Sequence, residues 1–314
     1  MNAPGSRLRD ALRERRFAVT AELSPPRGAD PDVMRRGARV LHDWVDAANV
    51  TDNQGAMARL SSMAGCVLAL AEDVEPVMQL QCRDRNRLAL QSDLLGAAAL
   101  GIPNVLLLTG DHQRFGDHPE ARGVFDLDSV QLLWTARTMR DQAKLLSGKP
   151  LKSPPNWLIG GVENPFAPPL AFRAERLGKK NAAGAEFVQT QYVFDLPRFT
   201  AWMQAARELG LTSRCGVLAG VGPIPSLRAL ERMQQIPGIV IPATVEQRLR
   251  GVPPERVRDE SIALCAETIA ALRAIPDLAG VHVMAFGAES LVPEIVDRAG
   301  LGRRAHAWEN ERVG

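Results

Sequence analysis

Short apolar runs alternate with longer amphipathic segments along almost the whole chain. The clearest run, residues 105–109, is apolar or β-branched throughout and is followed at once by Gly110 and Asp111. A run that is apolar on both faces predicts a strand covered on both sides, as in parallel α/β sheets. The glycine allows a sharp turn, so the aspartate is expected at the carboxyl end of this strand, where ligands bind in such proteins.

The same pattern predicts eight strands, each with a helical segment after it. The strands are expected at residues 17–23, 45–51, 76–80, 105–109, 156–162, 186–191, 214–220 and 281–286. The helical segments are expected at residues 30–43, at a stretch ending near 70, and at 83–100, 128–146, 172–183, 196–209, 226–235, 255–274 and 291–299. Eight strands alternating with helices predict an α/β fold, a (β/α)8 TIM barrel.

A doubly wound sheet would also alternate strands with helices. However, no GxGxxG motif follows the first strand, and no obvious linker divides the chain. We therefore expect a single barrel domain over residues 1–314. It would begin with a lead-in helix within residues 1–16 and carry a helical insertion at about residues 236–276.

Composition narrows the class of protein. The formal net charge is +2 with no long run of one sign, which argues against a nucleic-acid-binding surface. The apolar runs are far too short to span a membrane, and no signal-peptide core follows the N-terminus. The four cysteines lie far apart without a CxxC pair, which argues against a zinc ribbon, an iron–sulfur cluster or a disulfide framework and favours a reducing cytoplasm.

Polar side chains recur where the predicted strands end. They are Glu22, Thr51, Gln79, Gln81, Asp111, Asn164 and Gln191. Each alone has a structural explanation, such as an ion pair at the rim or a hydrogen bond to a loop. Together they would converge on the carboxyl-end mouth of a barrel, which favours a site there.

Glu22 lies in the mostly apolar stretch VTAELSPP. Partial burial there would raise its pKa and keep it protonated, which suits a general acid near neutral pH. Asp111 is expected across the barrel from it. Two carboxyl groups in distinct surroundings can divide roles, one donating a proton and one staying charged.

Two basic or histidine-rich stretches allow two interpretations each. Lys179 and Lys180 could lie near a phosphate at the mouth, although a solvated helix end fits their spacing somewhat better. His112 and His118, with the neighbouring aspartates, could bind a metal. Their spacing matches no standard motif, so we expect a polar lid and no metal. The residues alone thus indicate a barrel enzyme with an acid on strand one and a carboxylate after strand four.

The chain resembles the methylenetetrahydrofolate reductase family over nearly its whole length. The resemblance is carried by the segments AELSPPRG, NVTDNQG, QLQCRDRNRLALQSDLLGAAALGIPNVLLLTGDH, GVENPF, GAEFVQTQYVFD and GVHVMAFGAE. It implies a (β/α)8 barrel that holds FAD at its mouth and passes a hydride to methylene-tetrahydrofolate, giving methyl-tetrahydrofolate. It also implies NADH or another electron donor as co-substrate.

The resemblance assigns roles to individual residues. Glu22 matches the general acid that helps open the methylene bridge, and Asp111 matches the aspartate that contacts the pterin and tunes the flavin. Gln191 matches the glutamine that binds folate and nicotinamide in turn. The flavin-contacting positions would be Thr51, Gln79, Thr109, Gly110, Asp111, Asp126, Asn164 and Lys180.

The chain also departs from the best-known bacterial members. Gln79 stands where they have a histidine, Thr109 where they have an arginine, and Val162 where a tyrosine packs on the flavin. Leu227 takes the place of a substrate-contacting aromatic residue, and Ala288 that of a folate-contacting arginine. The chain is in this respect more similar to members from organisms with corrinoid-linked one-carbon metabolism.

Two alternatives to a free-standing reductase remain open on the sequence. One is a folate-binding methyltransferase-type barrel, which needs no flavin. The other is a partner-dependent subunit of a larger complex that metabolises methyl groups. A homo-oligomer is expected, and a partner redox subunit is compatible with the departures.

Overall fold

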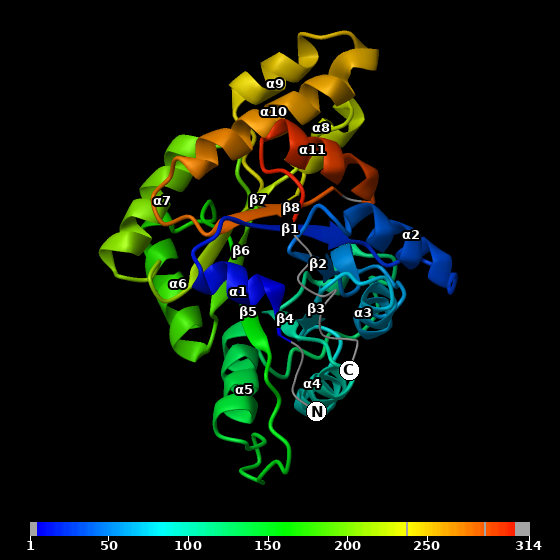
Figure 1. The fold of residues 1–314 in the computed structure, drawn as a ribbon, viewed down its shortest axis with the longest axis vertical. Helices are drawn as coiled ribbons and strands as arrows, with labels where there is room; N and C mark the ends of the chain where they lie inside the picture. Colours follow the sequence, from blue (N-terminus) through cyan, green and yellow to red (C-terminus); the bar gives the residue numbers. More distant parts are fainter. Residues whose placement is uncertain (1–4, 237, 286, 305–314) are drawn as a thin grey trace.

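The computed structural model describes residues 5–236, 238–285 and 287–304 (Figure 1). Its strands pair in parallel in chain order, and β8 pairs with β1 to close the barrel. They are β1 Ala18–Leu23, β2 Ala47–Val50, β3 Pro76–Gln81, β4 Asn104–Leu108, β5 Leu158–Glu163, β6 Phe187–Tyr192, β7 Gly216–Val221 and β8 Gly280–Val283. The predicted (β/α)8 barrel is confirmed.

Helices follow the strands and cover the outside of the barrel, except α1, which precedes β1 (Figure 1). They are α1 Arg7–Arg13, α2 Pro31–Leu41, α3 Ser62–Leu70, α4 Arg87–Ala99, α5 Ser129–Asp141, α6 Arg173–Ala183, α7 Leu196–Glu208, α8 Leu227–Gln234, α9 Ala243–Arg250, α10 Val257–Arg273 and α11 Val292–Arg298. Short 3-10 turns are η1 Gln54–Ala56, η2 Gln113–Phe115, η3 Leu170–Phe172, η4 Pro254–Arg256 and η5 Glu289–Leu291. The segment expected as a helical insertion contains α9 and the whole of α10.

Two predicted helices are shorter than expected. The helix predicted to run to residue 146 ends at Asp141, because Ala143 and Gly148 adopt positive φ values and Lys144 pairs with Pro150 in an isolated bridge. The helix predicted from residue 83 begins at Arg87, where the Asn86 side chain accepts hydrogen bonds from the backbone of the first turn. Phe286, the expected end of the last strand, lies outside the described residues.

The amino end of the barrel is closed by apolar side chains. Leu8 and Ala11 of α1 pack against one inward residue from most strands. These inward residues are Ala18, Ala47, Val77, Leu106, Leu158, Phe187 and Leu218. Because strand side chains alternate between faces, the positions two and four residues further along the same strands also point inward, toward the mouth.

A buried carboxylate holds α1 in this place. Glu75 accepts hydrogen bonds from the backbone N–H groups of Arg7 (2.6 Å) and Leu8 (3.2 Å), from Ser6 Oγ (2.9 Å) and from Asn104 Nδ2 (2.7 Å). The first-turn N–H groups of a helix have no partner within the helix, so this carboxylate supplies one and complements the positive end of the helix dipole.

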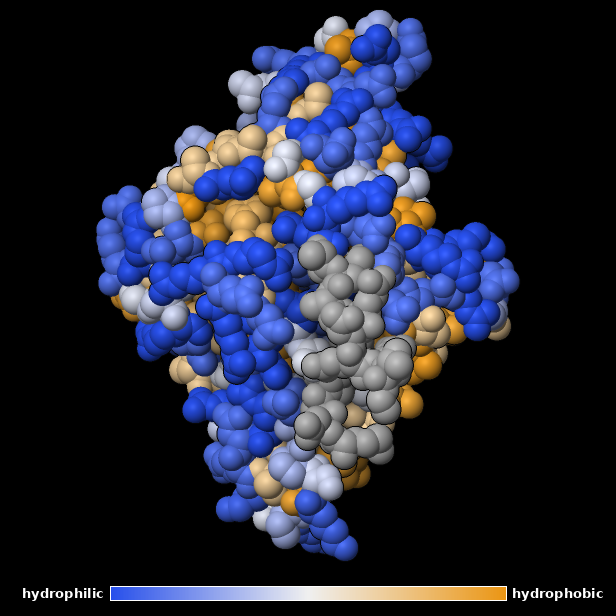
Figure 2. All heavy atoms as spheres, in the orientation of Figure 1, coloured by the Kyte–Doolittle hydropathy of each residue, from blue (hydrophilic) through white to orange (hydrophobic). Residues whose placement is uncertain are grey.

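The face that carries α1 is covered mainly by hydrophilic residues (Figure 2). In the part of the chain that the structure describes, no helix combines the length and the apolar character needed to cross a membrane.

Candidate active site

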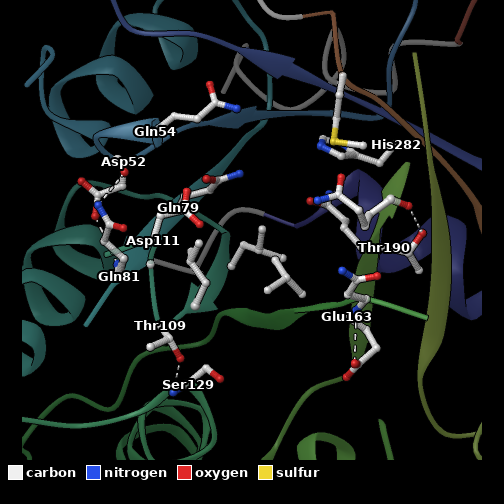
Figure 3. A pocket seen from close by; sticks show the side chains of 18 of the residues that line it. Asp52, Gln54, Gln79, Gln81, Thr109, Asp111, Ser129, Glu163, Thr190 and His282 are labelled. Carbon is white, nitrogen blue, oxygen red and sulfur yellow. Dashed lines mark hydrogen bonds between the residues drawn. The ribbon is translucent and has the colours of Figure 1, made fainter. Parts of the chain in front are cut away.

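The mouth of the barrel contains a cavity of about 420 Å³ (Figure 3). This volume lies within the range of small-molecule sites. Nine of the residues predicted from the sequence line it together: Glu22, Gln79, Gln81, Thr109, Gly110, Asp111, Asn164, Lys180 and Gln191. The acid of the first strand and the carboxylate after the fourth strand therefore share one cavity.

Glu22 lies near the end of β1 and is only 5% exposed. Gln54 Nε2 lies 3.2 Å from Glu22 Oε1 and 3.4 Å from Oε2. Burial raises the pKa of Glu22 to about 7; the hydrogen bond from Gln54 opposes the rise, and the negative charge of Glu289 adds to it. A carboxyl group with such a pKa can hold and donate a proton near neutral pH.

A hydrogen-bonded polar layer forms the floor of the cavity, one step above the apolar plug. Asn49 and Gln189 exchange two amide hydrogen bonds of 2.5 and 3.0 Å, and Gln189 Nε2 donates to Thr20 Oγ1 at 3.3 Å. Thr20 Oγ1 is 2.9 Å from His282 Nδ1. Burial lowers the pKa of His282 to about 3, so its imidazole is neutral at physiological pH. This layer was not predicted from the sequence, although the period-two alternation of polar residues along the strands could have revealed it.

The turn after β4 presents Asp111. Gly110 has φ +90°, and a Cβ there would lie 2.2 Å from Gln81 Oε1, so glycine is required both for the conformation and for the space. Thr109 Oγ1 accepts a hydrogen bond from the backbone of Ser129 at 3.1 Å, which ties this turn to the start of α5 (Figure 3). The Asp111 side chain is exposed at the rim of the cavity.

A cationic group surrounds the end of β5, the strand that pairs with β4. The buried carboxylate of Glu163 has Lys180 Nζ at 3.1 Å, Arg173 Nη1 at 3.9 Å and Arg176 Nε at 4.0 Å. Lys180 also donates to the carbonyl of Val162. Burial lowers the pKa of Lys180, and the charge of Glu163 counteracts this. Three cations around one carboxylate leave a surplus of positive charge, which suits a phosphate-bearing ligand.

Gln191 contributes an amide to the same cavity from the end of β6. Its Oε1 accepts from the backbone of Tyr192 at 3.0 Å, and its Nε2 has no hydrogen-bond partner among the described residues. The Thr51 side chain is fully buried and does not line this cavity, and its Oγ1 has no hydrogen-bond partner among the described residues. The free amide nitrogen of Gln191 can therefore still bind a ligand.

Asp126 and Leu227, which were also expected at the site, do not line this cavity. Asp126 faces α4, where it accepts hydrogen bonds from the backbone N–H and the guanidinium of Arg87. Leu227 begins α8 and packs into a separate apolar cluster with Leu230 and Leu249. Sequence position alone could not show which way these two residues face.

The histidine-containing loop has its own hydrogen bonds. His112 Nδ1 accepts from the backbone of Arg114 at 3.2 Å. Across the described ranges, no three His, Cys, Asp or Glu side chains are arranged to hold a metal ion.

A closed parallel barrel with a buried acid and convergent amides at its carboxyl ends defines a (β/α)8 protein with a small-molecule site at its mouth. A family model described as methylenetetrahydrofolate reductase matches residues 7–300, so the chain belongs to the methylenetetrahydrofolate reductase family.

Curated relatives agree with this assignment. A probable methylenetetrahydrofolate reductase (NADPH) of Caenorhabditis elegans is 22% identical over 97% of this chain and 46% of its own length. Methylenetetrahydrofolate reductase 1 of Schizosaccharomyces pombe is 24% identical over 73% of this chain and 36% of its own. The chain thus spans less than half the length of these curated relatives.

Among solved structures, an uncharacterized protein from Clostridium thermocellum that binds two copies of 5-methyl-5,6,7,8-tetrahydrofolic acid has a TM-score of 0.68. It is 12% identical, and the match covers 94% of this chain and 99% of that one. At this identity the likeness concerns the fold.

Proposed function

We propose that the protein interconverts methylene-tetrahydrofolate and methyl-tetrahydrofolate as a flavin-dependent oxidoreductase. The observation that carries the proposal is the buried Glu22, with a pKa of about 7, in one cavity with Asp111 in a chain of this family. A reductase needs a proton donor beside the folate ring and a negative charge near the cation that forms there.

Glu22 would act as the general acid. Protonation of a ring nitrogen makes it a better leaving group, so the methylene bridge opens to a cationic iminium. The Asp111 carboxylate would stabilise that cation and orient the pterin. In the reverse direction the same two groups serve, because Glu22 would then accept the proton.

The residues at the mouth fit FAD. The surplus charge of Arg173, Arg176 and Lys180 complements a pyrophosphate. Gln79, Thr109, Gly110 and Asn164 would complete the site. When bound, the flavin would supply the hydride for the folate.

NADH or another electron donor would be the co-substrate, and Gln191 would bind the nicotinamide and the folate in turn. The four cysteines are free, which suits our proposal of a reducing cytoplasm as the site of the reaction. We propose a homo-oligomer, with a partner redox subunit as the alternative source of electrons.

One absorbance experiment on the purified full-length protein tests the proposal. A flavin spectrum that bleaches on anaerobic addition of NADH and returns with methylene-tetrahydrofolate supports it, as does bleaching by methyl-tetrahydrofolate. A colourless protein that binds methyl-tetrahydrofolate would instead indicate a methyltransferase-type barrel. A yellow protein that turns over only with cell extract would indicate a partner-dependent subunit.

A further inference from the structure

The loop after β2 adopts an unusual backbone conformation. Asn53 and Ala56 have φ values of 42° and 58°, and Gly55 has 64°. The left-handed region is unfavourable for residues with a Cβ, and such conformations persist only where the surroundings enforce them. Gln54 lies in the middle of this segment.

Several contacts enforce the conformation. The Asn53 carbonyl accepts from Arg83 Nη2 at 3.2 Å, and Asn53 Oδ1 accepts from the backbone of Arg59 at 3.1 Å. Gly116 packs so closely that a Cβ there would lie 1.8 Å from the Ala56 carbonyl oxygen. Arg83, itself 3% exposed, also donates to the Asp111 carbonyl at 3.1 Å. One buried guanidinium thus joins the loop of Gln54 to the turn that carries Asp111.

This arrangement extends the Gln54 amide into the cavity (Figure 3), where its nitrogen is within 3.4 Å of both oxygens of Glu22. We propose that Gln54 is the positioning residue of Glu22. The Gln54 amide fixes the orientation of the Glu22 carboxyl group beneath the mouth and sets the strength of Glu22 as an acid. The inference rests on the proposed function for its catalytic meaning, but its effect on Glu22 can be measured without it.

The direction of the effect follows from the groups around Glu22. An amide N–H donates to the charged carboxylate and favours it, whereas burial and the like charge of Glu289 favour the protonated form.

The other polar groups near Glu22 do not replace this hydrogen bond. His282 faces the same cavity as a neutral ring, Tyr192 is buried nearby, and Asp52 is neutralised by Arg85 at 2.7 Å. Of these groups, Gln54 is the one that donates a hydrogen bond to the carboxyl group.

The first test is an infrared titration of the Glu22 carboxyl band in the full-length protein without folate, with the Glu22→Gln spectrum subtracted. Gln54→Ala is expected to raise the pKa of Glu22 by about one unit, since one hydrogen bond to a charged group is lost. Glu289→Gln should shift it the opposite way, because it removes a negative charge and keeps an oxygen for the Ser24 N–H.

Gln204→Ala is the matched control. Gln204 also donates to a carboxylate, Glu208, at 3.0 Å, but on the exposed face of α7. It should leave the titration unchanged. Gln54→Met removes the amide and keeps the side-chain volume, so it gives the answer if alanine disturbs the loop. An unshifted Glu22 in Gln54→Met would overturn the proposal.

The second test is the pH profile of kcat. Activity should fall as pH rises through the pKa of Glu22. In Gln54→Met this fall is expected at a higher pH, by the same shift as the pKa of Glu22 in the infrared titration. The maximal kcat of Gln54→Met should fall about tenfold, as expected for the loss of one hydrogen bond to a charged group, with little change in the KM for folate. A rise in KM with kcat and the pH limb unchanged would mean that Gln54 only binds substrate. If the wild type has no reductase activity, the infrared titration still decides the role of Gln54.

Discussion

Glu75 at the closed end of the barrel and Glu22 at its mouth are both almost completely buried. Burial raises the pKa of each. Glu75, however, accepts four hydrogen bonds, two of them from the backbone of α1, and lies 3.8 Å from Arg7 Nε. Glu22 accepts hydrogen bonds from one side chain, the amide of Gln54, whose Nε2 lies 3.2 and 3.4 Å from the two carboxyl oxygens.

The difference shows how one barrel separates stability from chemistry. A buried carboxyl group whose lone pairs are all bonded fixes the elements around it and has no capacity left for a ligand. A buried carboxyl group with few partners destabilises the fold, and such a group is retained where a ligand is to complete its bonding. The same residue type therefore has a structural role at one end and a proposed catalytic role at the other.

The largest expected effect is on activity at the mouth. Glu22→Gln should lower kcat for methylene-tetrahydrofolate reduction by about 10²–10⁴-fold, because an amide cannot donate the proton. Flavin content, measured by absorbance, should be retained. Steady-state assays at neutral pH check this, with Glu75→Gln assayed below its melting temperature as the matched substitution at the other end. Undiminished folate turnover in Glu22→Gln would refute the assigned role.

The next effect is on stability at the closed end. Glu75→Gln should reduce the free energy of unfolding by on the order of 3 kcal/mol, because an amide presents its nitrogen to groups that are themselves donors. Urea denaturation followed by circular dichroism measures it. A loss below about 1 kcal/mol would mean that α1 is held by its apolar contacts alone.

These two glutamates also show what the sequence could reveal. The alternation of strands and helices predicted the barrel, because period two and period 3.6 are local properties. It placed Glu22 at a strand end in an apolar stretch, where burial and a raised pKa follow directly. The importance of Glu75 was missed, since its partners Ser6 and Asn104 are distant in sequence and meet only once α1 has crossed the end of the barrel.

The same reasoning explains which of the expected site residues line the cavity and which do not. Residues on strands were placed correctly because the pleat fixes their direction, as for Gln79 and Gln191. Asp126 and Leu227 lie beyond strand ends, where loop conformation decides direction, and both face away from the cavity. Arg173 and Arg176 were overlooked because a helix start gives no sign that a buried Glu163 lies beneath it.

A third prediction concerns the pH dependence of stability. The pKa of Glu22 is raised from 4.5 to about 7 in the folded state, so between these values the folded protein binds more protons than the unfolded chain. The free energy of unfolding should therefore fall as pH rises through this window. Above pH 7 the ionisation of buried Glu22 destabilises the folded protein by about 3 kcal/mol.

Glu22→Gln removes this destabilisation, because an amide does not ionise. The variant should match the wild type near pH 4 and exceed it by up to about 3 kcal/mol at pH 8, whereas Glu75→Gln should be less stable than the wild type at pH 8. Denaturation curves at the two pH values give the comparison. Equal stability of Glu22→Gln and wild type at pH 8 would show that Glu22 is better solvated than its burial indicates.

The smallest effect separates two glutamines on β6 that lie two residues apart. Gln191 faces the cavity with a free amide nitrogen, whereas Gln189 is bonded to Asn49 and Thr20 in the floor. Gln191→Ala should lower kcat/KM about tenfold with folate and with NADH, equivalent to about 1.4 kcal/mol, and leave the melting temperature nearly unchanged. Gln189→Ala should lower the melting temperature, because it leaves buried partners unsatisfied.

If Gln191→Ala lost only flavin, Gln191 would belong to the cofactor site. If both variants lost stability equally, Gln191 would belong to the structural floor together with Gln189, and the ligand-binding part of β6 would begin only after Gln191.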